Sequence, residues 1–235
     1  MSNLLEIVNQ HYQNKSNQRV YLYPRKAMDI SDVLRCKRMR FLKYNNAPAD
    51  KYEAEDLRMF SMGNVVEELL FQAFDRAGIL RRTQQYIVSR IDERIRGKLD
   101  FVLTLAGLNK VVEVKSQGDF PYQKRTKKKD PQSINPRYGA QALMYVDTLL
   151  TYPQEEIDKE AIIVEVRRSD LELHETYVHY TPAVFAPIEA DFRETLLAID
   201  SNTLPPVLPD FPSNWECSYC RFKGECKKLF REGKI

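Results

Sequence analysis

Two short runs of sequence decide the fold, GKLDFVL at 97–103 and VVEVKSQ at 111–117. Their apolar and β-branched residues predict two β-strands, and side chains alternate across a strand. In the second run Glu113 and Lys115 therefore share one face, while the valines face the core. The first run carries Asp100 at its middle. Three charged groups on two neighbouring strands indicate either a functional cleft or a solvent-facing sheet surface.

Outward from these runs, the pattern predicts one α/β domain with a mixed sheet. The Pro- and Lys-rich segment 118–136 and the tail after residue 200, with its four prolines, are predicted to be loops. The expected strands lie at 85–91, 94–105, 110–116, 160–168 and 172–180, and the expected helices at 31–44, 51–77 with a break near Gly63, 137–150 and 182–199.

Composition sets the broad class. The chain has 235 residues, of which 43% are hydrophobic, enough for a sizeable core. A net charge of +3 is too weak to assign a partner by itself. No apolar run approaches the roughly 18 residues of a membrane span, and the polar N-terminus has no signal-peptide features. We therefore expect a soluble cytoplasmic protein that does not bind membranes.

The acidic residues of the two runs predict a cation site. Carboxylates from neighbouring strands supply the oxygen ligands that Mg²⁺ or Mn²⁺ prefers, and such an ion activates water for attack on a phosphoryl group. Lys115 would add positive charge beside the attacked phosphate. The alternative is an ordinary charge pair on a half-exposed strand.

Two helical features strengthen the functional interpretation. Glu67 falls within the apolar stripe of its helix, near Leu70 and Phe74, where a carboxylate is costly unless it is paired or bound to metal. The alternative is a glutamate at the edge of the stripe that reaches water. Gln141 and Tyr145 are four residues apart and so share one helical face. A purely structural role is the alternative for that pair.

The cysteines form a C-x₂-C-x₅-C cluster, Cys217, Cys220 and Cys226, with Cys36 far upstream. Three clustered thiolates plus one distant thiolate fit a four-cysteine site that holds an iron–sulfur cluster or zinc. Free buried cysteines are the alternative, and a disulfide is disfavoured in the cytosol. Trp215 precedes the cluster and is expected to pack over it.

A basic segment follows the second run directly. Cations gather phosphates and aromatic rings stack on exposed bases, so these residues are candidates for DNA binding, although a lysine run is also typical of a solvated loop. They are Lys124, Arg125, Lys127, Lys128, Lys129, Arg137 and Tyr138.

Taken in order, these motifs resemble the PD-(D/E)XK nuclease superfamily, in particular its RecB-like branch with a four-cysteine iron–sulfur cluster. The CRISPR adaptation nuclease and the AddB nuclease domain belong to that branch. The resemblance rests on Cys36, Gly63-x-x-x-Glu67, Gly97-x-x-Asp100, Glu113-Val114-Lys115, Gln141-x-x-x-Tyr145 and C-x₂-C-x₅-C.

The resemblance implies a restriction-endonuclease-like core and a role for each motif. Asp100, Glu113 and the Val114 carbonyl would bind the metal, and Lys115 would be the catalytic lysine. Gln141 and Tyr145 would be accessory catalytic residues that position the DNA, and the four cysteines would hold a structural [4Fe–4S] cluster. The implied regions are a helical N-terminal part (1–80), a nuclease core (81–180), and a C-terminal helix with the iron–sulfur tail (181–235).

One position departs from the family pattern. Glu67 stands where the helix motif usually has histidine, and a carboxylate there would still bind Mg²⁺ or Mn²⁺. The sequence has no helicase motif, so a motor, integrase or recombination protein would be a separate partner.

The sequence thus predicts a metal-dependent deoxyribonuclease, an exonuclease on single-stranded DNA or DNA ends, for CRISPR adaptation or for viral or plasmid DNA processing. The alternatives are a catalytically weak or inactive nuclease-like module that binds DNA or a protein, and a redox protein in which the cluster is the active component.

Overall fold

The computed structural model describes residues 4–17, 26–126 and 134–233. The chain groups into two compact units. The first, which we call the cysteine unit, comprises residues 1–28, 35–61 and 194–235. The second, the sheet unit, comprises residues 29–34 and 62–193. No described helix combines the length and apolarity that crossing a membrane requires.

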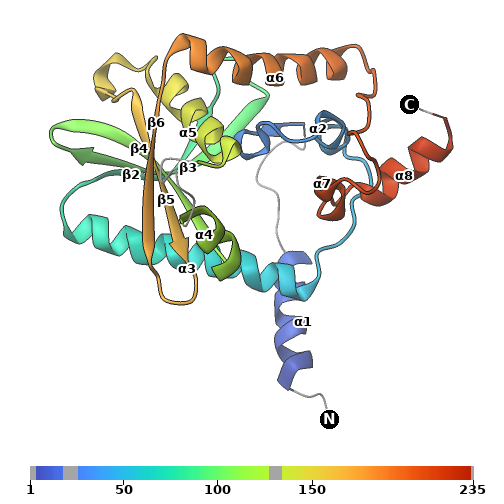
Figure 1. The fold of residues 1–235 in the computed structure, drawn as a ribbon, viewed down its shortest axis with the longest axis horizontal. Helices are drawn as coiled ribbons and strands as arrows, with labels where there is room; N and C mark the ends of the chain where they lie inside the picture. Colours follow the sequence, from blue (N-terminus) through green and yellow to red (C-terminus); the bar gives the residue numbers. More distant parts are fainter. Residues whose placement is uncertain (1–3, 18–25, 127–133, 234–235) are drawn as a thin grey trace. The chain divides into compact units, whose positions relative to one another are not determined.

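A six-stranded mixed sheet forms the framework of the sheet unit (Figure 1). The strand order is β1-β3-β4-β5-β6, and β2 pairs with β3. The β2–β3, β3–β4 and β5–β6 pairs are antiparallel, whereas β4 and β5 are parallel. The strands are β1 (Met28–Asp29), β2 (Leu80–Val88), β3 (Ile95–Leu105), β4 (Leu108–Gln117), β5 (Glu160–Arg167) and β6 (Leu173–His179).

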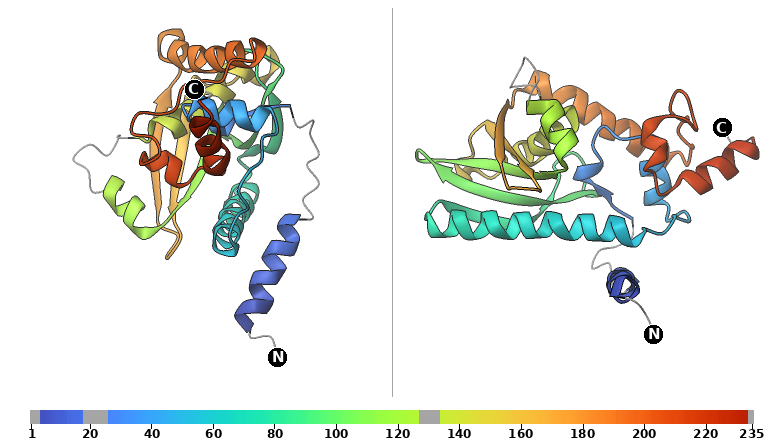
Figure 2. Two further views of the ribbon diagram at one scale, coloured as in Figure 1. Left: turned by 90° about the vertical axis from the view of Figure 1, so that its right-hand side faces the viewer. Right: turned by 60° about the horizontal axis from the view of Figure 1, so that its bottom comes forward.

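Helix α3 (Ala54–Arg76) covers one face of this sheet, and the second view of Figure 2 shows it running along the strands. Val66, Leu70 and Phe74 are spaced by four residues and pack on the core of β3, β4 and β5. The Phe74 ring meets Phe101 edge-to-face at 5.3 Å. Each buried side chain of this size contributes about 1.5–3 kcal/mol, so the apolar stripe fixes the helix on the sheet.

Helix α5 (Pro136–Leu149) packs against β4, β5 and β6, and nearly all of its residues are buried. Asn135 caps it by accepting the Arg137 N–H at 3.0 Å, and Pro136 occupies the first turn. Helix α4 (Asp119–Thr126) follows β4, α6 (Pro182–Asp200) follows β6, and two 3₁₀ turns lie at Ile30–Asp32 and Pro153–Glu155. This arrangement is the predicted mixed α/β plan.

Some predicted boundaries are wrong. The helix expected at 31–44 begins only at Lys37 as α2 (Lys37–Tyr44), after the 3₁₀ turn at Ile30–Asp32. Helix α3 continues through Gly63, because its apolar stripe is held by the sheet and outweighs the cost of one glycine. The loop expected at 118–136 contains α4, which Tyr122 anchors by its burial and its contact with Arg167.

The cysteine unit contains α1 (Leu4–Asn17), α2, α7 (Trp215–Ser218) and α8 (Lys223–Arg231). The tail expected as a loop thus includes two short helices. Main-chain contacts tie the tail to the segment after α2, where Asp50 N–H donates to Arg221 O at 2.6 Å. The Arg221 guanidinium also lies 4.0 Å from the centre of the Tyr52 ring. Trp215, expected to pack over the cysteines, is 64% exposed instead.

Candidate active site

The candidate site lies where β3 and β4 separate. Their pairing runs from Leu105–Leu108 to Phe101–Val112 and stops there. Beyond this point β3 pairs with β2, and β4 pairs with β5. Asp100 and Glu113 occupy the next positions on the two diverging strands. The Asp100 carboxylate accepts the Val114 N–H at 2.8 Å and so takes the place of the missing strand partner.

Burial and neighbouring negative charges disfavour the ionised form of the carboxylates in this fork. Burial raises the pKa of Asp100 well above its usual value, and the neighbouring charges of Glu113 and Glu67 add to the rise. Burial also raises the pKa of Glu113, against the opposing effect of Lys115. Glu113 is 1% exposed, and its Oε2 has no hydrogen-bond partner among the described residues. Buried charge of this kind needs a compensating cation.

The main chain of Val114 also faces the fork. The N–H and C=O of one strand residue point to the same side of the strand. Because the Val114 N–H meets Asp100, the Val114 carbonyl is directed to that side as well. The predicted ligand set of two carboxylates and one carbonyl is therefore geometrically consistent with the strand fork.

Lys115 lies beside the two acids, and its amine makes hydrogen bonds to residues of both β4 and α5. Its Nζ donates to Glu113 Oε1 at 2.5 Å and to Gln141 Oε1 at 3.1 Å. It also lies 5.3 Å from the centre of the Tyr138 ring. Burial by itself would lower the pKa of Lys115, but the charges of Glu113 and Asp100 together raise it. The amine is therefore protonated at neutral pH, which suits a donor of charge and hydrogen bonds and not a base.

Gln141 and Tyr145 connect α5 to the fork. The Tyr145 hydroxyl donates to the Lys98 carbonyl at 3.0 Å, and Gln141 hydrogen-bonds the same hydroxyl. Burial raises the pKa of Tyr145, so the hydroxyl remains a donor. Gly97 makes this approach possible, since a Cβ there would lie 2.7 Å from the Tyr145 oxygen and 2.8 Å from Ile30 Cβ. The predicted pair thus positions Lys115 and anchors the helix.

Glu67 approaches the site from α3. Its Oε2 accepts the Gln84 side-chain N–H at 2.9 Å, and its charge contributes to the raised pKa values of Asp100 and Glu113. Among the residues that the structure describes, no three His, Cys, Asp or Glu side chains are gathered as a metal-ligand set. Glu67 is thus near the two strand acids but is held by Gln84, and its role as a ligand stays a prediction.

The donor set nevertheless fits a divalent cation. Two carboxylates and one main-chain carbonyl are hard oxygen ligands. Glu113 Oε2 is buried and has no hydrogen-bond partner among the described residues, so a cation bound there would compensate its charge. Asp100, Glu113 and the Val114 carbonyl would hold the ion. When bound, it would supply Lewis-acid activation of water and neutralise phosphoryl charge.

Only part of the predicted DNA-binding set can be placed. Lys124 and Arg125 belong to the last turn of α4, whereas Lys127, Lys128 and Lys129 lie outside the described residues. Arg137 and Tyr138 begin α5. The Tyr138 ring lies beside Lys115, and its hydroxyl accepts from Gln117 Nε2 at 3.0 Å.

Sequence reasoning missed one buried acid beside the site. Glu165 on β5 is 1% exposed, pairs in register with Lys115 across the parallel strands, and lies 3.4 Å from Gln117 Nε2. The signal was present, because Val-Glu-Val occurs at 164–166 as it does at 112–114. The argument that singled out Glu113 applies equally to Glu165.

The four cysteines all belong to the cysteine unit. Burial raises the pKa values of Cys217, Cys220 and Cys226, and the proximity of other cysteines, including Cys36, adds to the rise in each case. The structure therefore brings the distant Cys36 near the C-terminal cluster. Their sulfur atoms are not gathered as a metal-ligand set in the described part of the chain.

Comparison with known proteins identifies the family. The sequence model described as the PD-(D/E)XK nuclease superfamily matches residues 4–227. The chain belongs to the PD-(D/E)XK nuclease superfamily. A search of curated protein sequences returns no significant match.

Solved structures agree with this membership at the level of the fold. SSO0001 has a TM-score of 0.59 and 17% identity over 96% of each chain. An alkaline exonuclease from Laribacter hongkongensis, LHK-Exo, has a TM-score of 0.52 and 13% identity over 87% of this chain and 95% of its own. These similarities show a restriction-endonuclease-like fold with a central mixed sheet flanked by helices.

Proposed function

We propose that this PD-(D/E)XK protein is a Mg²⁺- or Mn²⁺-dependent deoxyribonuclease, an exonuclease that cleaves single-stranded DNA or DNA ends. The observation that carries the proposal is the meeting of Asp100, Glu113 and Lys115 at the β3–β4 fork, where a buried carboxylate oxygen has no partner among the described residues. The description of LHK-Exo as an alkaline exonuclease supports the choice of an exonuclease.

The chain's own residues would divide the work. Asp100 and Glu113 would hold the ion, and their burial excludes bulk water that would screen their charges. Lys115, kept protonated by its neighbours, donates hydrogen bonds to the phosphoryl oxygens and stabilises the negative charge that develops on them. Gln141 holds the lysine amine in place, and Tyr145 fixes α5 against β3.

The test is cleavage of end-labelled oligonucleotides by Lys115→Ala. Removal of one preorganised charge donor typically costs about 10²–10³-fold in rate, and DNA binding should remain. Lys98→Ala is the matched control, because Lys98 is an exposed lysine of the same sheet whose contact to Tyr145 is made by its carbonyl.

Single- and double-stranded substrates with free and blocked ends, each tested with Mg²⁺ and with Mn²⁺, would define the mode of cleavage. Cleavage by Lys115→Ala at the wild-type rate would refute the role of Lys115. DNA binding without cleavage by the wild-type protein in either metal would favour the inactive binding module. The biological settings, CRISPR adaptation and viral or plasmid DNA processing, stay predictions.

We also propose that Cys36, Cys217, Cys220 and Cys226 hold a [4Fe–4S] cluster. Support comes from the C-x₂-C-x₅-C spacing together with Cys36, and from Arg38, which is 1% exposed in the same unit. Arg38 Nε donates to the Pro205 carbonyl at 2.6 Å, and its Nη1 and Nη2 have no hydrogen-bond partner among the described residues. A buried cation is costly unless an anion compensates it, and metal-bound thiolates would supply that anion.

Anaerobic purification tests the cluster proposal. The expected result is a brown protein with about four iron and four sulfide per chain, and loss of both in Cys226→Ser. A colourless protein that contains one zinc per chain would refute the iron–sulfur cluster and leave the nuclease proposal intact.

A further inference from the structure

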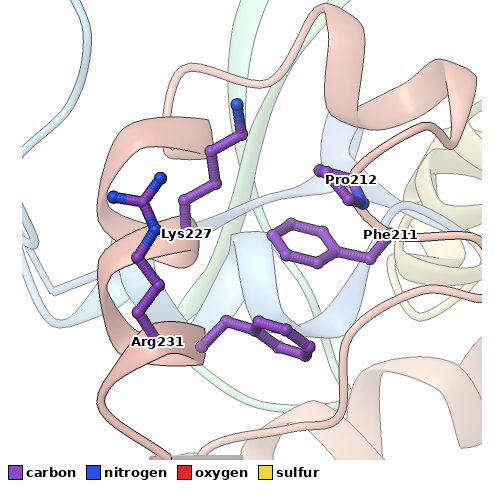
Figure 3. Close-up of a pocket in the computed structure, with 5 residues that line it drawn as sticks. Phe211, Pro212, Lys227 and Arg231 are labelled. Carbon is purple, nitrogen blue, oxygen red and sulfur yellow. The ribbon is translucent and has the colours of Figure 1, made fainter.

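A small hollow lies in the cysteine unit between α8 and the segment that precedes α7 (Figure 3). Phe211 and Pro212 line it from the segment, and Lys227, Phe230 and Arg231 line it from α8. Its volume is about 320 Å³. That value is at the lower end of the roughly 300–1,000 Å³ of small-molecule sites, so the hollow has room for one small planar group.

The floor of the hollow is aromatic. The Phe211 and Phe230 rings are 5.3 Å apart between centroids and tilted by 51°. Phe230 is nevertheless 42% exposed, so part of its side chain remains accessible to solvent despite this contact. An exposed ring face beside a second ring is a stacking surface for another flat π-system, such as a nucleobase.

The rim of the hollow is cationic. Lys227 and Arg231 are one helical turn apart on α8 and share a face with Phe230. Neither has a carboxylate partner among the described residues, whereas the adjacent Lys228 lies 3.8 Å from Glu225. The helix carries four cations and only one carboxylate. The two unpaired charges are therefore available to an anion held above the rings.

We propose that this hollow binds one nucleotide of a single-stranded DNA, with the base stacked on Phe230 and the flanking phosphates on Lys227 and Arg231. Rings that accept any base, next to charges that accept any phosphate, give binding without sequence preference. The proposal rests on the nuclease function for the identity of the ligand. It adds a DNA contact in the cysteine unit to the contacts at the strand fork.

The first test measures charge through salt dependence. A fluorescently labelled oligothymidylate is bound to the full-length protein in buffer without divalent cations, so that no cleavage occurs, at several salt concentrations. Each phosphate contact to a single strand contributes about 0.7 to the slope of log K against log [salt]. We expect K227Q/R231Q to reduce the slope by about 1.4. K228Q removes one charge, at the lysine that lies beside Glu225, and should change the slope by much less than the roughly 0.7 expected for one phosphate contact.

The second test measures stacking. Phe230→Leu keeps an apolar side chain but removes the ring, and the loss of one stacked base should weaken binding by about 5- to 150-fold with no change in salt slope. An abasic oligonucleotide should bind the wild-type protein more weakly by a similar factor. It should bind Phe230→Leu and the wild-type protein equally, because neither complex then has the ring–base contact.

Three results would overturn the proposal. One is an unchanged salt slope for K227Q/R231Q. The second is an equal loss of affinity of Phe230→Leu for abasic and for normal DNA. The third is displacement of DNA by polyglutamate as effective as that by an unlabelled oligonucleotide, which would indicate an acidic peptide as the ligand. A separate cleavage assay tests the nuclease proposal. Absence of metal-dependent cleavage by the wild-type protein would refute that proposal, and the binding measurements above do not depend on cleavage.

Discussion

Removal of the charge at Asp100 should stabilise the metal-free protein while it abolishes cleavage. Asp100 and Glu113 follow the last paired positions of β3 and β4, and the charge of Glu113 adds to the raised pKa of Asp100. At an effective dielectric constant of about 20, two like charges roughly 5 Å apart would repel by about 3 kcal/mol. Lys115 offsets part of this, because it lies 2.5 Å from Glu113. We expect Asp100→Asn to raise the free energy of unfolding by about 1–3 kcal/mol.

The expected pH dependence follows from the direction of the pKa shift. The pKa of Asp100 is raised in the folded protein, so the wild-type protein loses stability as pH rises from the ordinary pKa of an aspartate through the folded value. The advantage of Asp100→Asn should therefore grow as pH rises above about 4, the ordinary pKa of an aspartate, and vanish below it. Urea unfolding with a chelator present measures it. Addition of Mg²⁺ should stabilise the wild-type protein more than the variant.

Asp158→Asn is a control of opposite sign. Asp158 accepts from Lys110 Nζ at 2.6 Å and from the Glu160 N–H at 3.1 Å, and the Lys110 contact helps to lower its pKa against the effect of burial. Its substitution should reduce stability by roughly 1 kcal/mol at pH 8, and this contribution is lost as pH falls. The account of the fork as an acidic site that lacks a compensating cation is refuted if the free energy of unfolding of Asp100→Asn is equal to or lower than that of Asp158→Asn.

Two further predictions concern packing around the site. Gly97→Ala should lose about 1–3 kcal/mol and reduce cleavage, because its Cβ would displace the Tyr145 hydroxyl; Gly63→Ala, whose nearest neighbour would be 3.6 Å away, should remain within about 1 kcal/mol of wild type. Equal effects of the two alanines in urea unfolding would contradict this. Asp147→Asn should lose about 1–3 kcal/mol, since the buried carboxylate accepts from Arg90 at 2.7 Å and from the Tyr180 hydroxyl at 2.8 Å. An unchanged denaturation midpoint would argue against that network.

The strands and the faces on which their acids lie were open to prediction because the signal is local. Alternation of side chains assigns Glu113 and Lys115 to one face whatever the rest of the chain does. The helix predicted at 137–150 corresponds in the same way to α5. Superfamily membership followed from the order of these motifs, and the match over residues 4–227 confirms it.

Tertiary structure decided how these groups meet. No local pattern states that β3 and β4 part at Asp100, that Val114 N–H is left for its carboxylate, or that Gly97 admits Tyr145. The burial of Arg38 on a short helix of cationic sequence was equally hidden, since it depends on a carbonyl 167 residues away. The sequence by itself determined which residues carry charge and which face they share. Only the folded chain decided which charges are buried without a partner, because burial depends on contacts between segments that are distant along the chain.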